Sequence, residues 1–492
     1  MLFIGLDLGT TGIRTIVIDE LGEIKIKLTE KFSKEILYKN CENMAGKHEQ
    51  NPDAWKINFF TILKKILERL KDLEYSPNDI GGICTDSTSG TILPVDDQGN
   101  HLSNAIMYND IRSKKEAKII QEVSGVFNKK VGYKFKASFS LPKIFWIKNN
   151  RTDIFKKTSK FLHANDFLVG LLSDEFYHSD SSNCLKTGYD FIDNEWPLFI
   201  LKDLEISKNK LPKVKNPGTL IAKTSKNLEK KLGFPSEIPI IAGCTDGTMA
   251  LLASGASEYG DIFTSLGTTL VTRVLSPSLI IDPQGRIYSH IFPSRKIIYL
   301  PGGASSVGAE CLEAYFSDIN FREYDKEALK SFPTHILNYP LVKRGERFPF
   351  IDENAEHFCQ KNPVNKYELY TSYLQSIAFV EKLALEVLES LGAPIGNRVF
   401  TIGGATKSKD WLQIRADVLQ KVIYRPKIIE AAFGAAILAA SSIMFNHNLL
   451  KTIKQFVKPD LIIHPRKEFK DKIEQIYQKF LIEIKNRYEI QI

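Results

Sequence analysis

Residues 2–19 read LFIGLDLGTTGIRTIVID, and this stretch decides the fold. Apolar and β-branched residues dominate on both sides of the turn GTTG at 9–12, so we expect two strands joined by a tight turn. Asp7 interrupts the first strand. Because a buried carboxylate is costly unless a partner compensates it, the stretch indicates a site that handles a cation and phosphate groups.

The composition is that of an ordinary globular protein. The chain has 492 residues, of which 43% are hydrophobic and 25% charged, enough for two or three domains. A formal charge of +8 is mild for this length and argues against nucleic-acid binding. The six cysteines are scattered without a C-x-x-C pair, as expected for reduced thiols in a cytoplasmic protein. We expect neither a signal peptide nor a membrane segment, because the apolar runs are short.

The opening pattern recurs in DIFTSLGTTLVTRVLS, which again places Gly-Thr-Thr between two apolar strands. Two similar domains, each carrying a phosphate-sized turn, would face each other across a cleft. We expect a first domain at 1–235, a second at 236–445 and a basic helical tail at 446–492. The tail is either a surface helix docked by its apolar stripe or a partner-binding segment, and the stripe consists of Phe469, Ile473, Ile476, Phe480 and Ile484.

Three further segments each admit two interpretations. Asp246 in AGCTDGTMA follows a strand and opens a helix, so it is either an N-cap or a general base whose ionised form the helix N-terminus stabilises. The segment GGATKSKDW, 403–411, would offer flat backbone and Trp411 to a nucleotide, or form a tight turn before a core tryptophan. The segment YNDIR, 108–112, is a solvated loop or a set of polar groups for sugar hydroxyls. A Gly-Thr-Thr turn by itself is a plain hairpin, but two copies favour phosphate binding.

Taken together, these segments resemble one family, the FGGY carbohydrate kinases, over nearly the whole chain. The resemblance rests on IGLDLGTTGIR, EQNPDAW, YNDIR, AGCTDGTMA, TSLGTT, RGERFPF, GGATKSKDWLQIRADV and EAAFGAAILAA, in this order. It implies an α/β fold of two actin-like (ribonuclease-H-like, ASKHA) domains with an active-site cleft between them, in which ATP and a sugar meet.

The resemblance also implies roles for individual residues. Asp246 would be the catalytic base that takes a proton from a terminal sugar hydroxyl, and Asp7 would hold Mg²⁺ through water. The implied substrate-binding residues are Asp7, Ser89, Asn109, Asp110 and Asp246. The implied ATP-binding residues are Thr10, Thr11, Gly267, Thr268, Gly303, Gly403, Gly404, Ser408 and Trp411.

Within the family, TDSTSGTILPVD and LPGGASSVG look closest to the D-ribulose kinases of cyanobacteria and chloroplasts, a xylulose-kinase-like group. Xylulose kinases usually carry Gln-Met-His-Gly where this chain has Ser87-Thr88-Ser89-Gly90. We therefore expect an ATP-dependent kinase that converts D-ribulose to D-ribulose 5-phosphate, acting as a monomer or homodimer. The alternatives are a D-xylulose or other sugar or polyol kinase, and, in another class, a non-phosphorylating actin-like ATPase or sugar sensor.

Overall fold

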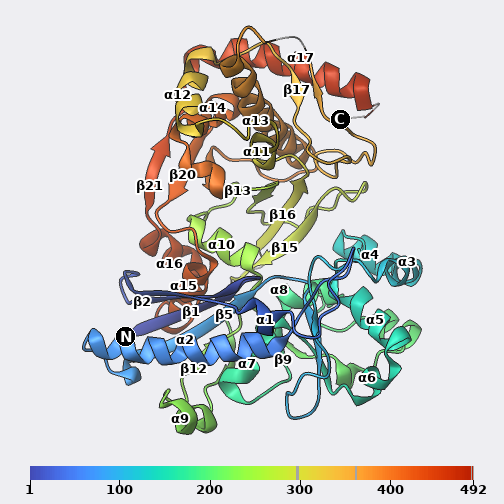
Figure 1. Ribbon diagram of the computed structural model, residues 1–492, viewed down its shortest axis with the longest axis vertical. Coiled ribbons are helices and arrows are strands. Elements are labelled where there is room, and N and C mark those ends of the chain that lie inside the picture. The colour runs from blue at the N-terminus through green and yellow to red at the C-terminus, as the bar shows by residue number, and fades with distance from the viewer. Residues whose placement is uncertain (295–297, 361–362, 489, 491–492) are drawn as a thin grey trace. The chain divides into compact units, whose positions relative to one another are not determined.

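The computed structural model describes residues 1–294, 298–360, 363–488 and 490, and the chain forms two compact units (Figure 1). Unit 1 comprises 1–253, 293–294 and 430–456, and unit 2 comprises the described residues of 254–292, 298–429 and 457–490. These limits differ from the predicted boundaries at 235 and 445. The chain leaves unit 1 after Ala253 and, apart from the short segment at 293–294, returns to it at Glu430, so neither unit is one continuous segment.

The main sheet of unit 1 has six strands in the order β11-β12-β5-β1-β2-β3. Strands β1, β5 and β12 run parallel, so their carboxyl ends meet at one edge, which we call the carboxyl edge. The predicted turn is present between β1 and β2, where the N–H of Gly9 donates to the carbonyl of Gly12 at 3.0 Å. The strands are β1 (Leu2–Leu8), β2 (Gly12–Asp19), β3 (Ile24–Lys31), β5 (Ile80–Ser87), β11 (Leu220–Lys223) and β12 (Pro239–Ile241).

Helices cover both faces of this sheet. Helix α15 (Ala431–Met444), which is rich in small residues, contacts β1, β2 and β5. Gly5 permits this close approach, because a Cβ atom there would lie 1.9 Å from the carbonyl oxygen of Ala432. On the opposite face, the apolar side chains of β1 share a core with Trp55 and Phe59 of α2 (Pro52–Asp72). Figure 1 shows α2 running along the sheet of unit 1.

The remaining elements of unit 1 are shorter. A second sheet of four strands contains β4 (Glu49–Gln50), β7 (Ala105–Ile106), β6 (Ile92–Val95) and β8 (Lys160–His163). Strands β9 (His178–Asp180) and β10 (Lys213–Lys215) form a parallel pair. The helices are α1 (Lys34–Leu37), α3 (Lys114–Val123), α4 (Gly125–Val131), α5 (Ser140–Asn150), α6 (Thr152–Lys157), α7 (Ala164–Ser173), α8 (Ser181–Cys184), α9 (Lys226–Leu232), α10 (Asp246–Ser254) and α16 (Leu449–Phe456).

The main sheet of unit 2 repeats the strand pairing of unit 1. The antiparallel pairs β13/β14 and β14/β16 correspond to β1/β2 and β2/β3 of unit 1. The parallel pairs β13/β19 and β19/β20 correspond to β1/β5 and β5/β12. Antiparallel β20/β21 then corresponds to β12/β11. The internal repeat predicted from the two Gly-Thr-Thr turns is therefore confirmed. The strands are β13 (Ile262–Leu266), β14 (Leu270–Val274), β15 (Tyr288–Phe292), β16 (Ile298–Ser305), β19 (Arg398–Ile402), β20 (Val422–Pro426) and β21 (Pro459–Ile463).

The chain's final helix belongs to the core of unit 2. Four residues of the predicted apolar stripe, Ile473, Ile476, Phe480 and Ile484, are at most 2% exposed and join the same hydrophobic cluster as residues of α13 and α14, whereas Phe469 precedes the helix and is only partly buried. The docked-helix interpretation of the tail is thus confirmed. The remaining elements of unit 2 are β17 (Asn338–Tyr339), β18 (Phe358–Cys359), α11 (Glu310–Tyr315), α12 (Phe321–Ser331), α13 (Lys366–Ser390), α14 (Lys409–Leu419) and α17 (Lys470–Tyr488).

Two further observations concern the cysteines and the helices. All six cysteines carry free thiols. Among the described residues, no helix combines the length and the apolar character needed to cross a membrane.

Candidate active site

Three aspartates lie at the carboxyl edge of unit 1. Asp7 in β1 pairs in register with Asp86 in β5, so the two side chains point to the same face of the sheet. Thr245 forms a bridge with Ser87 at the end of β5, and the next residue, Asp246, opens α10. Ligands of open α/β sheets bind beyond the carboxyl ends of the strands, so this edge is the first place to look for a site.

Asp7 is buried, as predicted, but it has a partner that sequence reasoning missed. It is 5% exposed, and Arg14, its neighbour across the β1/β2 ladder, donates from Nη1 to Oδ2 at 3.0 Å. Burial raises the pKa of the Asp7 carboxyl, and the guanidinium of Arg14 opposes that shift. Part of the cost of burying Asp7 is therefore offset within the hairpin itself.

Asp86 was not among the site residues predicted from the sequence. It is fully buried, and neither carboxylate oxygen accepts a hydrogen bond from a donor in the described part of the chain. Burial, followed by the negative charges of Asp7 and Asp246, raises its pKa well above the usual value. A hydrogen bond between Asp7 and Asp86 requires a proton on one of them. In the sequence, Asp86 stands near the end of an apolar strand, as Asp7 does, and this position could have marked it as a candidate.

Asp246 is the first residue of α10, and it is only partly exposed. The N–H of Gly247 donates to its Oδ1 at 2.6 Å. Its carboxylate lies close enough to Asp86 for the two charges to interact. A carboxylate at a helix N-terminus is stabilised in its ionised form, which is the form that accepts a proton.

Hydrogen bonds from outside the hairpin support the turn of Thr10 and Thr11. The amide Nε2 of Gln50 donates to the carbonyl of Thr10 at 2.9 Å, and Trp55 donates from Nε1 to Oε1 of Gln50 at 3.0 Å. The carbonyl of Thr11 accepts from Phe32 at 3.0 Å. Two residues of the segment EQNPDAW therefore help to position the turn.

A pocket of about 550 Å³ in unit 1 brings several of the predicted residues together, and its volume suits a small-molecule ligand. Thr10 and Thr11 line it together with Asn109 of the YNDIR segment. The other lining residues are Tyr38, Cys41, Asn43, His48, Glu49, Gln50, Met107 and Tyr108. Ser89, Asp7 and Asp246 are not among them.

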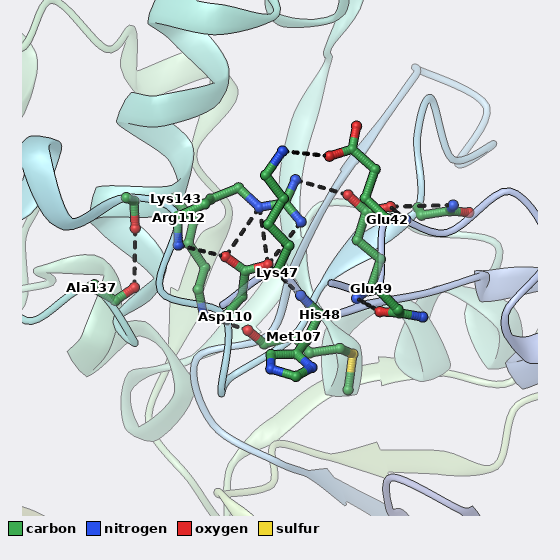
Figure 2. A network of polar contacts seen from close by, with 12 residues as sticks. Glu42, Lys47, His48, Glu49, Met107, Asp110, Arg112, Ala137 and Lys143 are labelled. Atoms are coloured by element: carbon green, nitrogen blue, oxygen red, sulfur yellow. Dashed lines mark hydrogen bonds and ion pairs between the residues drawn. The ribbon is translucent and has the colours of Figure 1, made fainter. Parts of the chain in front are cut away.

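Asp110 supports the site rather than facing a ligand (Figure 2). It is fully buried, and its oxygens already accept hydrogen bonds from the backbone N–H of His48 at 2.7 Å and from the guanidinium of Arg112. Arg112 also donates to Oε1 of Glu49 at 2.8 Å. The carboxylate of Asp110 therefore holds β4 and Arg112 in place, and its binding of sugar stays a prediction.

Lys143 in α5 links two of the predicted sugar-binding segments. Its fully buried Nζ donates to the carbonyls of Gly90 at 2.7 Å, Met107 at 2.7 Å and Ser138 at 3.1 Å. Gly90 follows Ser89, and Met107 precedes YNDIR. Burial lowers the pKa of Lys143 well below its usual value. No motif in the sequence marks this lysine, because its three acceptors are backbone atoms of distant segments.

In unit 2, Gly267 and Thr268 form the second turn, between β13 and β14. The N–H of Gly267 donates to the carbonyl of Thr269 at 3.2 Å, and the Gly267 carbonyl accepts from Ala309 at 2.7 Å. Thr268 is exposed. Gly303 instead lies inside β16, where a Cβ atom would meet the ring of Phe348 at 2.5 Å, so it makes room for packing.

The GGATKSKDW segment divides into an open part and a core part. Gly403 has φ of 106° and lies against the carbonyl of Leu266, and Gly404 is exposed with open space beside its Cα. Ser408 is the N-cap of α14, accepting from the N–H of Trp411 at 3.1 Å. Trp411 is 3% exposed, and its Nε1 donates to the carbonyl of Leu374 at 3.3 Å. Trp411 is therefore a core residue, the second of the two interpretations, and its ring offers almost no surface to a nucleotide.

Comparison with known proteins identifies the family. The N-terminal domain of the FGGY family of carbohydrate kinases matches residues 2–253, and the C-terminal domain of that family matches residues 304–443. A xylulose kinase of Staphylococcus xylosus is 26% identical over 448 residues, which cover 89% of this chain and 90% of that protein. The xylulose kinase of Bacillus subtilis (strain 168) is 23% identical over 493 residues, covering 97% of this chain and 95% of the relative.

Solved structures show the same fold along the whole chain. A xylulose kinase from Rhodospirillum rubrum has a TM-score of 0.88 at 20% identity and covers 99% of both chains. The glycerol kinase from Plasmodium falciparum with ADP has a TM-score of 0.86 at 20% identity, covering 100% of this chain and 99% of that one. The predicted two-domain α/β fold is thereby confirmed. Since both family domains match, this chain belongs to the FGGY family of carbohydrate kinases, and it is a sugar kinase whose substrates are a sugar and ATP.

Proposed function

We propose that the chain transfers the γ-phosphoryl group of ATP to the terminal hydroxyl of D-ribulose, giving D-ribulose 5-phosphate and ADP. The observation that carries the proposal is the meeting of Asp246 with Asp7 and Asp86 at the carboxyl edge of unit 1. Phosphoryl transfer needs a group that accepts the proton of the attacking hydroxyl and positive charge that neutralises the phosphates. The carboxyl edge offers a base and acidic groups for a cation side by side.

Asp246 acts as the general base. Its carboxylate accepts the proton of the terminal hydroxyl as the hydroxyl oxygen bonds to the γ-phosphorus and the bond from that phosphorus to the β,γ-bridging oxygen breaks. The N-terminus of α10 and the N–H of Gly247 keep the carboxylate ionised before the transfer. A positioned general base contributes roughly 10²- to 10⁴-fold to a rate.

The acidic groups at the carboxyl edge fit a hydrated magnesium ion. Asp7 is buried, and Arg14 is paired with one of its oxygens, Oδ2. Mg²⁺ keeps several of its waters in proteins and is held by one or two carboxylates together with substrate phosphates. When bound, the ion neutralises phosphate charge as the transferred group moves. Asp7 would hold this ion through water.

Each unit carries a turn suited to phosphate oxygens. The turn at Thr10 and Thr11 in unit 1 and the turn at Gly267 and Thr268 in unit 2 offer backbone N–H groups and hydroxyls to phosphate oxygens. The exposed backbone at Gly404, at the end of β19, lies on the nucleoside side.

The sugar is recognised by Ser89 and Asn109, on segments that Lys143 holds. D-xylulose is the second candidate, because several curated relatives are named xylulose kinases. The two sugars differ in configuration at one carbon, so the choice depends on single hydroxyl contacts. A site built to bond a hydroxyl discriminates strongly against a substrate that cannot offer it. Ser89, in place of a Met-His pair, favours D-ribulose.

The test is the value of kcat/KM for D-ribulose and D-xylulose in one ADP-release assay, with glycerol and D-gluconate as comparison substrates. The proposal predicts the highest value for D-ribulose and a lower ratio of D-ribulose to D-xylulose in Ser89→Ala. A higher value for D-xylulose would move the assignment to the second candidate. Values for both pentuloses below those for glycerol or gluconate would refute the ketopentose assignment altogether.

A further inference from the structure

Asp86 is a buried acid to which no N–H or hydroxyl group of the described residues donates, and the hydrogen bond that it can share with Asp7 needs a proton on one of the two carboxyls. Its exposed fraction is 0%, and both of its carboxylate oxygens lack a donor. An ionised carboxylate in such a place loses its hydration without compensation, which is strongly destabilising. A fold that keeps this residue at the carboxyl edge needs a group from outside the chain to satisfy it.

The neighbours of Asp86 increase the negative charge rather than balance it. Asp86 and Asp7 are register partners on adjacent parallel strands, which lie about 4.8 Å apart in a sheet. The charge of Asp246 also acts on Asp86. Arg14 bonds to Asp7, and its side chain is 44% exposed. One partly exposed guanidinium opposes the charges of these neighbouring carboxyl groups, and the raised pKa of Asp86 indicates that it does not balance them.

A dication satisfies these conditions better than a sugar hydroxyl does. A hydroxyl would donate one hydrogen bond to Asp86 and leave the charge in place, whereas Mg²⁺ or its bound waters would satisfy the oxygens and neutralise the charge. Among the described residues, no three His, Cys, Asp or Glu side chains form a group that could hold a metal. The expected site is therefore a pair of carboxylates completed by phosphate oxygens and water, which is the usual arrangement for Mg²⁺ with nucleotides.

We propose that Asp86, together with Asp7, forms the protein's side of the magnesium site, so that the metal bound with ATP interacts with two carboxylates on adjacent strands. This proposal rests on the proposed function, since it places the metal that the kinase uses. It adds Asp86 as a magnesium-binding residue and leaves Asp246 free to serve as the base.

The test uses Mn²⁺ as a substitute for Mg²⁺ and a non-hydrolysable ATP analogue, without sugar. Water-proton relaxation enhancement and electron paramagnetic resonance measure the affinity of the protein–nucleotide complex for Mn²⁺. We expect Asp86→Asn and Asp7→Asn each to weaken Mn²⁺ binding by at least ~10-fold, the lower end of the effect of outer-shell metal partners. Asp19→Asn is the matched control: it removes the same charge at the far end of the β1/β2 pair, opposite Leu2, and should leave the affinity unchanged.

Affinity of Asp86→Asn for Mn²⁺ within about twofold of wild type would overturn the proposal. The melting temperature in EDTA gives a second, independent reading: because the metal-free protein buries the Asp86 carboxyl at the cost reflected in its raised pKa, Asp86→Asn should melt no lower than wild type. A clearly lower melting temperature would mean that Asp86 has a stabilising partner within the protein, and would equally refute the proposal. Neither measurement needs sugar turnover, so the ketopentose assignment can fail while the metal assignment holds, and the reverse.

Discussion

Lys143→Met tests how the sugar-binding segments are held. The substitution keeps the length of the side chain but removes three hydrogen bonds to backbone carbonyls. The Met107 carbonyl still accepts from the N–H of Asp110 at 3.0 Å. The Ser138 carbonyl has no such substitute, because Pro142 lacks the N–H that would reach it from the first turn of α5.

The size of the effect follows from these contacts. The carbonyls of Gly90 and Ser138 each lose the donor that Lys143 gives them. Each buried carbonyl without a donor costs about 1–3 kcal/mol, and we therefore expect the free energy of unfolding to fall by about 2–6 kcal/mol. Because Ser89 and Asn109 flank two of the anchored carbonyls, the KM for the sugar should rise at least ~10-fold, which corresponds to about 1.4 kcal/mol of lost binding. The KM for ATP should stay within about threefold of wild type, because the substitution does not touch the phosphate turns.

The assay is steady-state ADP release with the sugar and ATP varied in turn, together with urea unfolding. Lys148→Met provides the matched control, since Lys148 lies on the same helix and its Nζ donates to the Leu204 carbonyl at 2.7 Å, away from the sugar segments. That variant should keep the sugar KM of the wild type. If Lys143→Met lost stability but raised the two KM values equally, Lys143 would be a general core anchor and the reasoning would be refuted.

Three further predictions concern other parts of the chain. Asp246→Ala should lower kcat with sugar by at least ~10²-fold while the ATP affinity stays nearly unchanged, and an unchanged kcat would remove Asp246 from the role of base. Gly5→Ala should lower the free energy of unfolding by about 1–3 kcal/mol, because the new Cβ would lie 1.9 Å from the Ala432 carbonyl oxygen; equal urea midpoints would contradict this close approach. Burial raises the pKa of Asp180 from 3.8 to about 6. As pH rises across that interval, the unfolded chain loses this proton more readily than the folded protein does, so the free energy of unfolding falls by roughly 3 kcal/mol in all. Urea unfolding between these pH values should show this decline in the wild type and not in Asp180→Asn, and parallel curves would count against it.

Local signals predicted the framework of the fold well. The alternation and the turn of residues 2–19 predicted β1 and β2. Asn51, directly before Pro52, caps α2 by accepting from the N–H of Asp53 at 2.9 Å, which is also a local feature. Ser408 likewise caps α14. These features depend on neighbours in the sequence, so a local pattern contains the information that decides them.

The features that were missed depend on contacts between distant segments. Two groups determine the environment of Asp86. One is Asp7, its register partner on β1, and the other is Asp246 at the start of α10, 160 residues further along the chain. Trp411 sits in the core because α14 packs on α13, which its own segment does not reveal. The return of 430–456 to unit 1 depends on the fit of α15 against Gly5. Sequence patterns identified the acids and turns, whereas tertiary packing decided which of them meet.

The most direct test of the account is the fate of the phosphoryl group, followed by ³¹P nuclear magnetic resonance in a reaction of the wild type with ATP, Mg²⁺ and D-ribulose. The account predicts a new phosphomonoester signal, coupled to the terminal methylene protons of the sugar, that grows in equal amount with ADP and is abolished in Asp246→Ala. Inorganic phosphate appearing with ADP, without a sugar phosphate from D-ribulose or D-xylulose, would contradict it.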